Sequence, residues 1–151
     1  MSVGIAIRRG VWVIPREFES ECLDAKRLNH DLEMLSTIAP NLCCRHSTFV
    51  ANDGQSEVRL LVKGTVPVVF RGSTYNIPME WYISQQYPIV APTLFVTPVA
   101  GMRLTRNNGY VDENGRVRCP YLDQWHNART LMELGSVLQA YFGGTLLCVW
   151  C

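Results

Sequence analysis

The chain has 151 residues, and we expect one domain over residues 1–151. Apolar residues make up 48% of it and charged residues 18%, which is typical of globular rather than disordered proteins. A net charge of +1 argues against a nucleic-acid-binding protein, and apolar runs such as residues 66–70 are too short to span a membrane. Residues 5–7 are apolar and precede Arg8 and Arg9, the reverse of a signal peptide, so we expect a cytoplasmic protein.

Cysteine spacing gives no metal site. The six cysteines are Cys22, Cys43, Cys44, Cys119, Cys148 and Cys151. The C-x-x-C at the end of the chain lacks the second pair of ligands that a zinc site needs. We therefore expect no metal and no cofactor, with the thiols reduced and mostly buried.

Residues 16–39 show a helical pattern in which apolar residues recur at steps of three and four. The pattern fits one long helix or two short ones, and Pro40 ends it. The apolar face, which we assign to the core, holds Phe18, Cys22, Ala25, Leu28, Leu32, Leu35 and Ile38. The polar residues Lys26, Arg27, Asp31 and Glu33 are assigned to the opposite face.

The period then changes to two, which predicts strands over residues 47–51, 58–70, 73–83 and 94–96. Turns are expected at residues 52–54 and at Arg71-Gly72. Pro67 indicates a sheet edge or a bulge, because proline cannot donate a hydrogen bond to a neighbouring strand. Short connections between consecutive strands predict an antiparallel meander.

Residues 101–125 are mostly irregular in pattern, and so long a stretch in a small domain usually carries function. A last helix is expected from Thr130, whose spacing to Glu133 is that of a capping box, to the Gly143-Gly144 pair. The predicted fold class is therefore α+β, with helices on one side of an antiparallel sheet.

A set of motifs resembles the ubiquitin-conjugating fold. In order, they are Tyr75-Asn76-Ile77-Pro78, Tyr87-Pro88, Ala91-Pro92, Phe95-Val96, Pro98, Asn114-Gly115, Pro120-Tyr121-Leu122 and Trp125. The chain resembles most closely the UEV domain (ubiquitin-conjugating enzyme variant) of the tumour-susceptibility/Vps23 type, in which an aromatic residue and Arg-Gly precede Tyr-Asn-Ile-Pro. That resemblance implies an N-terminal helix, a four-stranded meander, a long loop region and a C-terminal helix.

The resemblance also implies the absence of catalysis. In active conjugating enzymes a cysteine follows Gly-x-Ile and accepts ubiquitin as a thioester. Here Arg118 occupies that nucleophile slot, and a guanidinium cannot act as a nucleophile. Tyr110 stands where the catalytic asparagine would be. The alternative is an active enzyme that uses Cys119, one residue later, with Arg116 and Arg118 lowering the pKa of its thiol.

Two binding surfaces follow from the resemblance. A groove for Pro-Thr/Ser-Ala-Pro peptides would use Phe70, Tyr75, Asn76, Pro78, Val99 and Met102. Aromatic walls and a methionine suit an extended proline-rich ligand, although Phe70 and Val99 replace a tyrosine and a threonine of the family. Ordinary sheet packing is the alternative role for these residues. A second surface would bind ubiquitin through Val50, Asn52, Asp53, Tyr82 and Phe95.

The implied partners are ubiquitin, proline-rich motifs of sorting adaptors and other subunits of the ESCRT-I complex, in endosomal protein sorting. A different expectation is that the chain pairs with an active conjugating enzyme and directs which lysine is linked. The C-terminal tail at residues 145–150 departs from the family. We expect it to fold over the domain, and prenylation at Cys148 is the alternative.

Overall fold

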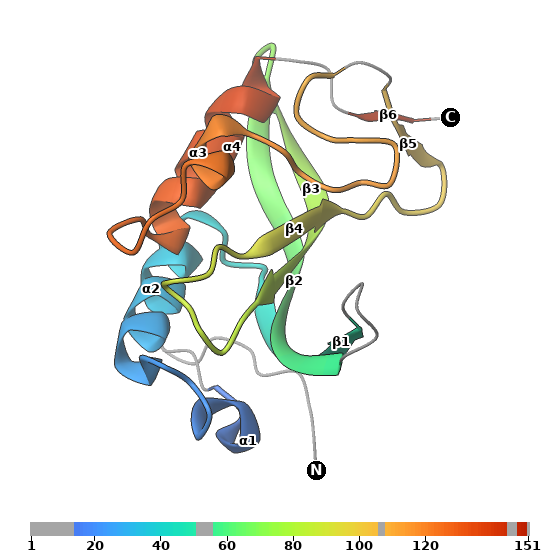
Figure 1. The fold of residues 1–151 in the computed structure, drawn as a ribbon. Coiled ribbons are helices and arrows are strands. Elements are labelled where there is room, and N and C mark those ends of the chain that lie inside the picture. Colours follow the sequence, from blue (N-terminus) through green and yellow to red (C-terminus); the bar gives the residue numbers. More distant parts are fainter. Residues whose placement is uncertain (1–13, 51–55, 106–107, 145–147, 151) are drawn as a thin grey trace.

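Four antiparallel strands, in the order β1-β2-β3-β4, form the sheet on which the fold is built (Figure 1). The computed structural model describes residues 14–50, 56–105, 108–144 and 148–150, with backbone only for 45–50, 56 and 148–150. The elements are α1 (Arg16–Glu19), α2 (Ala25–Ile38), β1 (Cys43–Val50), β2 (Ser56–Phe70), β3 (Ser73–Ile83), β4 (Thr93–Val96), β5 (Met102–Leu104), α3 (Pro120–Asp123), α4 (Leu131–Gly143) and β6 (Cys148–Trp150). The predicted α+β meander is confirmed.

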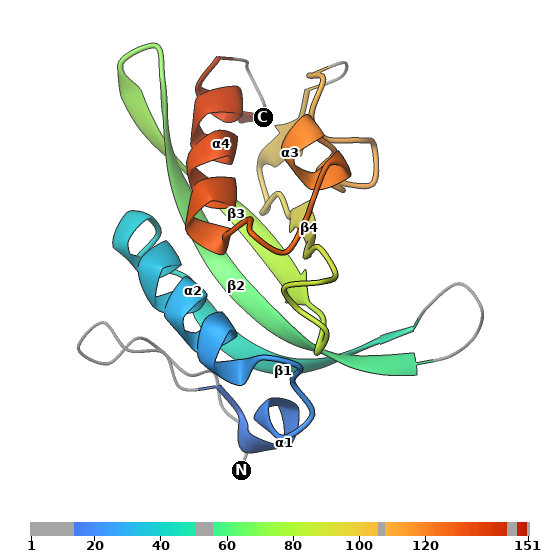
Figure 2. The ribbon, with the colours of Figure 1, turned by 60° about the vertical axis from the view of Figure 1, so that its left-hand side comes forward.

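Helices α2 and α4 lie side by side across one face of the sheet (Figure 2). They approach closely at Gly135, where a Cβ atom would lie 2.8 Å from the Cδ1 of Ile38. The core fills the space between these helices and the sheet, where buried strand residues alternate with partly exposed ones. Its buried members include Leu28, Leu32, Leu35, Leu60, Val62, Val66, Val68, Ile77, Met79, Trp81, Leu131, Leu134 and Leu138.

The N-terminal helical pattern forms two helices rather than one. Residues 20–24 separate α1 from α2, and the side chain of Asp24 accepts a hydrogen bond of 3.0 Å from the backbone N–H of Arg27. That contact satisfies a free N–H in the first turn, which is how an N-cap residue starts a helix. Helix α2 ends at Ile38, just before Pro40.

Two strand predictions need adjustment. Strand β1 starts at Cys43 rather than at residue 47, and residues 101–125 contain β5 and α3 within an otherwise irregular path. The edge assignment of Pro67 is confirmed, because β1 pairs with β2 only up to Lys63 and leaves the rest of β2 with β3 alone. The carbonyl of Pro67 instead accepts a 2.9 Å hydrogen bond from Gln139 of α4.

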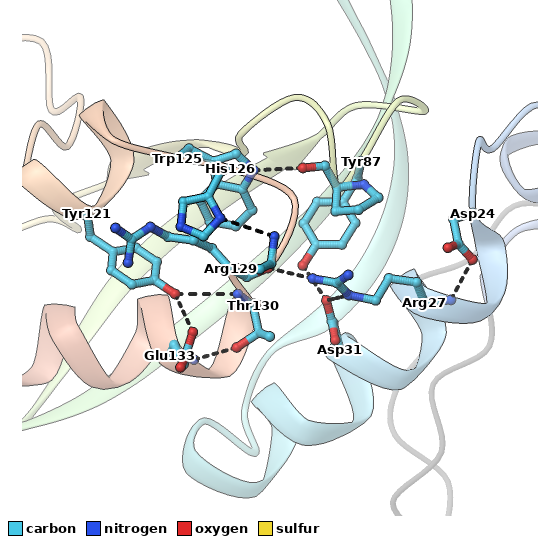
Figure 3. A network of polar contacts seen from close by, with 12 residues as sticks. Asp24, Arg27, Asp31, Tyr87, Tyr121, Trp125, His126, Arg129, Thr130 and Glu133 are labelled. Carbon is cyan, nitrogen blue, oxygen red and sulfur yellow. Dashed lines mark hydrogen bonds and ion pairs between the residues drawn. The ribbon is translucent and has the colours of Figure 1, made fainter.

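Asp31 was assigned to the polar face of its helix, and this is wrong. Its side chain is buried, and its carboxylate accepts hydrogen bonds from Arg27 Nε at 2.7 Å and from the Tyr87 hydroxyl (Figure 3). The Arg27 guanidinium also donates to the carbonyl of Arg129 at 2.6 Å. Trp125 donates to the carbonyl of Pro88 at 2.8 Å. These contacts tie the proline-rich loop before β4 to α2 and to the segment between α3 and α4.

The start of α4 carries a modified capping box. Thr130 accepts a 3.1 Å hydrogen bond from the backbone N–H of Glu133, as the sequence predicts. The usual second contact of a capping box, from the Thr130 backbone N–H to the Glu133 side chain, is bridged by the hydroxyl of Tyr121. The Thr130 N–H donates to the Tyr121 oxygen at 3.4 Å, and the Tyr121 hydroxyl donates to Glu133 at 2.8 Å. The pKa of Tyr121 is raised by burial and by Glu133, so its hydroxyl stays protonated.

Within the described part of the chain, every helix is too short or too polar to cross a lipid bilayer.

Candidate functional site

An aromatic cluster stands at the tip of the β2–β3 hairpin. Phe70 pairs with Ser73 across a two-residue turn, in which Arg71 and Gly72 take φ values of +50° and +82°. Positive φ at both central residues is the type I′ geometry that fits the twist of a hairpin. The Phe70 ring meets Tyr75 edge-on, with centroids 6.5 Å apart, and the Arg71 guanidinium lies 5.0 Å from the Phe70 centroid. Tyr75 remains 42% exposed, which leaves an aromatic surface open to a ligand.

The other predicted groove residues lie on two neighbouring segments. Tyr75 is in phase with the buried positions of β3, whereas Asn76 and Pro78 project from the opposite face. The carbonyl of Pro78 accepts a 2.9 Å hydrogen bond from Thr97, which holds the segment after β4 against β3. Val99, 52% exposed, follows, and its carbonyl accepts a 3.0 Å hydrogen bond from Met102.

An open cavity of about 1130 Å³ lies beyond Met102, between the end of β4, β5 and the loop that precedes α3. Its lining residues are Val96, Pro98, Met102, Arg103, Leu104, Thr105, Gly109, Tyr110, Val111, Asp112, Glu113, Asn114, Gly115 and Arg118. Met102 is the one predicted groove residue among them. Strand β6 pairs with β5 so that Met102 lies opposite Trp150, so this part of the tail does fold back onto the domain.

Arg118, in the predicted nucleophile slot, points outward at the cavity, whereas Cys119 points into the core. The Arg118 side chain is 66% exposed, and Cys119 is only 2% exposed. Adjacent residues in an extended segment face opposite ways, which is why one step along the chain has this effect. Burial and Asp123 raise the pKa of Cys119, and they outweigh backbone hydrogen bonds from Leu122 and Tyr121 that lower it. This direction is opposite to the lowering by Arg116 and Arg118 on which the alternative of an active enzyme depends.

The segment in the place of the catalytic asparagine is a structural turn. The buried Asn108 side chain donates to the carbonyls of Thr105 at 3.0 Å and Val111 at 3.2 Å. It also accepts hydrogen bonds from the backbone N–H groups of Tyr110 and Val111. All of its hydrogen-bonding groups are thus used to shape the loop. Tyr110 stacks on Tyr141 of α4 with centroids 4.5 Å apart, which is a packing contact.

The outer face of the sheet, turned away from the helices, carries the second predicted surface. Tyr82 and Phe95 meet there edge-on with centroids 5.9 Å apart. The Tyr82 hydroxyl donates to Glu80 at 2.9 Å, and Glu80 lies 3.5 Å from the Lys63 ammonium. Burial and the Glu80 carboxylate raise the pKa of Tyr82 to about 12. Arg59 adds another polar contact beside this aromatic pair, where it donates a hydrogen bond to the Thr93 hydroxyl at 3.2 Å.

Three predicted residues cannot be placed on this face. Asn52 and Asp53 lie outside the described residues, and Val50 is described by its backbone only. Among the described residues, no cluster of three or more histidine, cysteine or acidic side chains could hold a metal ion.

The family follows from a comparison of the whole sequence. A sequence profile named "UEV domain" matches residues 15–146. The chain belongs to the UEV family. UEV domains are catalytically inactive variants of ubiquitin-conjugating enzymes, which agrees with Arg118 in the nucleophile slot and with the buried Cys119.

Curated relatives include Protein ELC of Arabidopsis thaliana, 35% identical over 136 residues, which cover 89% of this chain and 33% of that protein. The Tumor susceptibility gene 101 protein of Homo sapiens is 38% identical over 97 residues, covering 64% of this chain and 25% of that protein. This UEV domain therefore spans a quarter to a third of the length of these relatives.

Solved structures show the same fold. The yeast Vps23 UEV domain in complex with a Vps27 PSDP peptide matches with a TM-score of 0.68 and 20% identity, over 86% of this chain and 93% of that one. A complex of the Vps23 UEV with ubiquitin matches with a TM-score of 0.64 and 22% identity, over 84% and 94%.

Two sets of polar contacts in the structure are not predicted from the sequence. One is the buried Asp31 with its partners, which the i, i+4 spacing of Arg27 and Asp31 beside the leucine stripe could have indicated. The other is the contact between Arg118 and Asp112 at the cavity, with 3.5 Å from Nε to Oδ2, for which the sequence carried no signal.

Proposed function

We propose that this UEV domain binds ubiquitin and short Pro-Thr/Ser-Ala-Pro-type peptides, and that it does so on two separate surfaces without catalysing a reaction. The observation that carries the proposal is the placement of two partly exposed aromatic pairs, Phe70–Tyr75 at the hairpin tip and Tyr82–Phe95 on the outer sheet face. Structural neighbours with this fold have been solved with a PSDP peptide and with ubiquitin.

The peptide surface is assigned to Phe70, Tyr75, Asn76, Pro78, Val99 and Met102, of which Tyr75 lies on the inner face of β3 and Asn76 and Pro78 project from its outer face. Exposed aromatic and apolar side chains suit a proline-rich ligand, because a polyproline II segment is already extended and loses little entropy on binding. Phe70 contacts both Tyr75 and Arg71, and these contacts restrict its ring before a ligand binds. The lack of a hydroxyl at Phe70 leaves apolar contact as its main contribution.

The ubiquitin surface is assigned to Val50, Asn52, Asp53, Tyr82 and Phe95. The Tyr82–Phe95 pair supplies an apolar centre, and the charges of Glu80 and Lys63 surround it. A small apolar centre with a polar rim is typical of weak, reversible interfaces, for which we expect a Kd in the micromolar range or above.

In the cell, we assign the domain to the cytoplasm and to endosomes, where it would recognise ubiquitin and the proline-rich motifs of sorting adaptors together with other ESCRT-I subunits. Its relatives include the ESCRT-I complex subunit tsg101 of Dictyostelium discoideum, 31% identical over 108 residues, which supports that setting.

Isothermal titration calorimetry with two matched variants tests the proposal. Tyr75→Ala should weaken a Pro-Thr-Ala-Pro peptide by about 5- to 30-fold and leave ubiquitin binding unchanged, because the loss of a central aromatic contact costs about 1–2 kcal/mol. Tyr82→Ala should do the reverse. Equal effects of both variants on both ligands would contradict two separate surfaces, and no heat with either wild-type ligand would reject the function.

A further inference from the structure

Lysines are rare in this chain, and the fold keeps them apart. Lys26 and Lys63 are the only lysines among these 151 residues, and the other basic side chains are arginines and histidines. The ε-amine of lysine is the side-chain group to which acyl groups, ubiquitin among them, are attached. Lys63 lies on β2 in the sheet, whereas Lys26 lies in the first turn of α2, in the helical layer (Figure 2).

Lys63 belongs to the surface proposed for ubiquitin. The strand register places Cys43, Lys63, Glu80 and Phe95 in one row across the outer face of the sheet, with one residue from each strand. Neighbouring strands lie about 4.8 Å apart, so the backbone of Lys63 is about 10 Å from that of Phe95. The Lys63 side chain is 55% exposed. An amine that is open to solvent therefore lies at the edge of the aromatic centre of this surface.

The contact between Lys63 and Glu80 leaves the amine available. The Lys63 Nζ lies 3.5 Å from Oε2 of Glu80, whose Oε1 accepts the Tyr82 hydroxyl at 2.9 Å. An ion pair in which one side chain is more than half exposed contributes little to stability and is screened by salt. The amine can therefore leave Glu80, while Glu80 keeps its hydrogen bond to Tyr82.

We propose that Lys63 is an attachment site for ubiquitin, and that the ubiquitin attached there occupies the domain's own ubiquitin surface. This inference rests on the ubiquitin-binding function proposed above and adds a modification site to it. The co-reactant is a ubiquitin-conjugating enzyme that carries ubiquitin as a thioester. After the Lys63 ammonium loses one proton to solvent, its Nζ attacks the thioester carbonyl. An isopeptide C–N bond forms, the C–S bond breaks, and the second amine proton ends on the thiolate of the enzyme.

Noncovalent binding to the surface is what directs the transfer to Lys63. Ubiquitin bound at Tyr82 and Phe95 holds its thioester-linked carboxyl terminus near the domain, which makes the attack effectively intramolecular. An extended chain spans about 3.3–3.6 Å per residue, so about three residues of the ubiquitin tail cross the distance from β4 to β2. Lys26 lies in the helical layer and does not share this advantage.

The attached ubiquitin should block the surface to which it is tethered. A ligand on a short flexible linker has an effective concentration on the order of 1 mM. For a Kd of about 0.1 mM, that concentration should weaken the binding of free ubiquitin about tenfold. The peptide surface at the tip of the β2–β3 hairpin is separate, so the affinity for peptide should not change.

The test offers the domain a conjugating enzyme preloaded with ubiquitin and follows attachment at each lysine by mass spectrometry. Lys63 should be modified about tenfold faster than Lys26, because only Lys63 gains from the tethering of ubiquitin. Tyr82→Ala should remove most of this advantage and leave the rate at Lys26 unchanged, whereas a lysine that is merely exposed would not respond to that variant. Lys63→Arg should lose the main product. Lys26→Arg is the matched control and should leave the rate at Lys63 as in wild type.

The outcomes separate this inference from the proposed function. No product at Lys63, equal rates at the two lysines, or a rate at Lys63 that Tyr82→Ala leaves intact would each overturn the attachment site, while noncovalent binding of ubiquitin by the unmodified domain stays established. Calorimetry on the purified Lys63 conjugate tests the blocking, and an unchanged affinity for free ubiquitin would overturn it. Failure of the unmodified domain to bind ubiquitin would reject the ubiquitin-binding function and this inference with it.

Discussion

Replacing Tyr87 by phenylalanine tests whether the buried Asp31 carboxylate depends on its hydroxyl donor. Tyr87 is 1% exposed and Asp31 is 2% exposed, so water cannot replace the lost hydrogen bond without entering the core. The variant keeps the ring and its contact with Trp125, whose centroid lies 6.0 Å away. Burial and Asp31 raise the pKa of Tyr87, so its hydroxyl stays protonated and remains a donor at neutral pH.

The magnitude follows from the charge of the acceptor. A hydrogen bond to a charged group contributes about 1.5–3 kcal/mol to stability. For a chain of this length each kcal/mol lowers the melting temperature by about 2–4 °C, so Tyr87→Phe should lower it by about 3–12 °C. Differential scanning calorimetry measures the shift directly, and urea denaturation gives the free energy of unfolding independently.

Tyr121→Phe is the matched control. Its hydroxyl also donates to a carboxylate, that of Glu133, but both groups are at least partly exposed to solvent. Water can replace that contact, so the expected loss is about 0.5–1.5 kcal/mol. If Tyr87→Phe destabilised the domain no more than Tyr121→Phe, the reasoning that ties the proline-rich loop to α2 through a buried charge would be refuted.

Three further predictions concern the loop at the cavity. Gly115→Ala should destabilise the domain more than Gly109→Ala, because both residues have similar positive φ values of +88° and +89°, but only at Gly115 would a Cβ atom strike a β4 carbonyl, at 2.5 Å. We expect about 1–2 kcal/mol for the Gly109 variant from the left-handed backbone alone, and equal losses in urea denaturation would contradict the clash. In native protein at pH 8, iodoacetamide should modify Cys119 far more slowly than the partly exposed Cys43, because Cys119 is buried and its pKa is raised; comparable rates by mass spectrometry would show the thiol to be accessible. The pKa of Asp112 is lower in the folded state, so its ionised carboxylate stabilises the fold at pH values above the ordinary carboxyl pKa of about 3.9. This stabilisation is lost as the pH falls through the lower pKa that Asp112 has in the folded state. The stability difference between wild type and Asp112→Asn should therefore be full at neutral pH and shrink as the pH falls below about 3.9 in thermal unfolding, and a difference that does not change with pH would refute the assignment.

The sequence predicts the sheet well because strand periodicity is a local signal. The third strand was predicted over residues 73–83 and is found there, and its buried residues alternate as the pattern requires. The first strand is predicted only from residue 47, because residues 43–46 carry no alternating apolar pattern, whereas β1 begins at Cys43. Their strand conformation comes from pairing with β2, which is a tertiary effect.

Asp31 shows why side-chain environment was harder to predict. It lies one position before Leu32 on α2, and an acidic residue there is normally assigned to solvent. Its burial depends on the hydroxyl of Tyr87, 56 residues later, and on Arg27. The cavity depends likewise on how residues 101–118 fold against β4, and the family resemblance identified only the position of Arg118 within it.

Binding of two ligands on two surfaces by this one domain is what we propose. It is tested most directly by an NMR titration in which unlabelled ubiquitin and then a Pro-Thr-Ala-Pro peptide are added to the same isotope-labelled sample. We predict that ubiquitin shifts the signals of Tyr82 and Phe95, and that the peptide then shifts those of Phe70, Tyr75 and Met102 without displacing ubiquitin. Signals that stay unshifted at saturating concentrations of either ligand, or a peptide that displaces ubiquitin, would contradict the account.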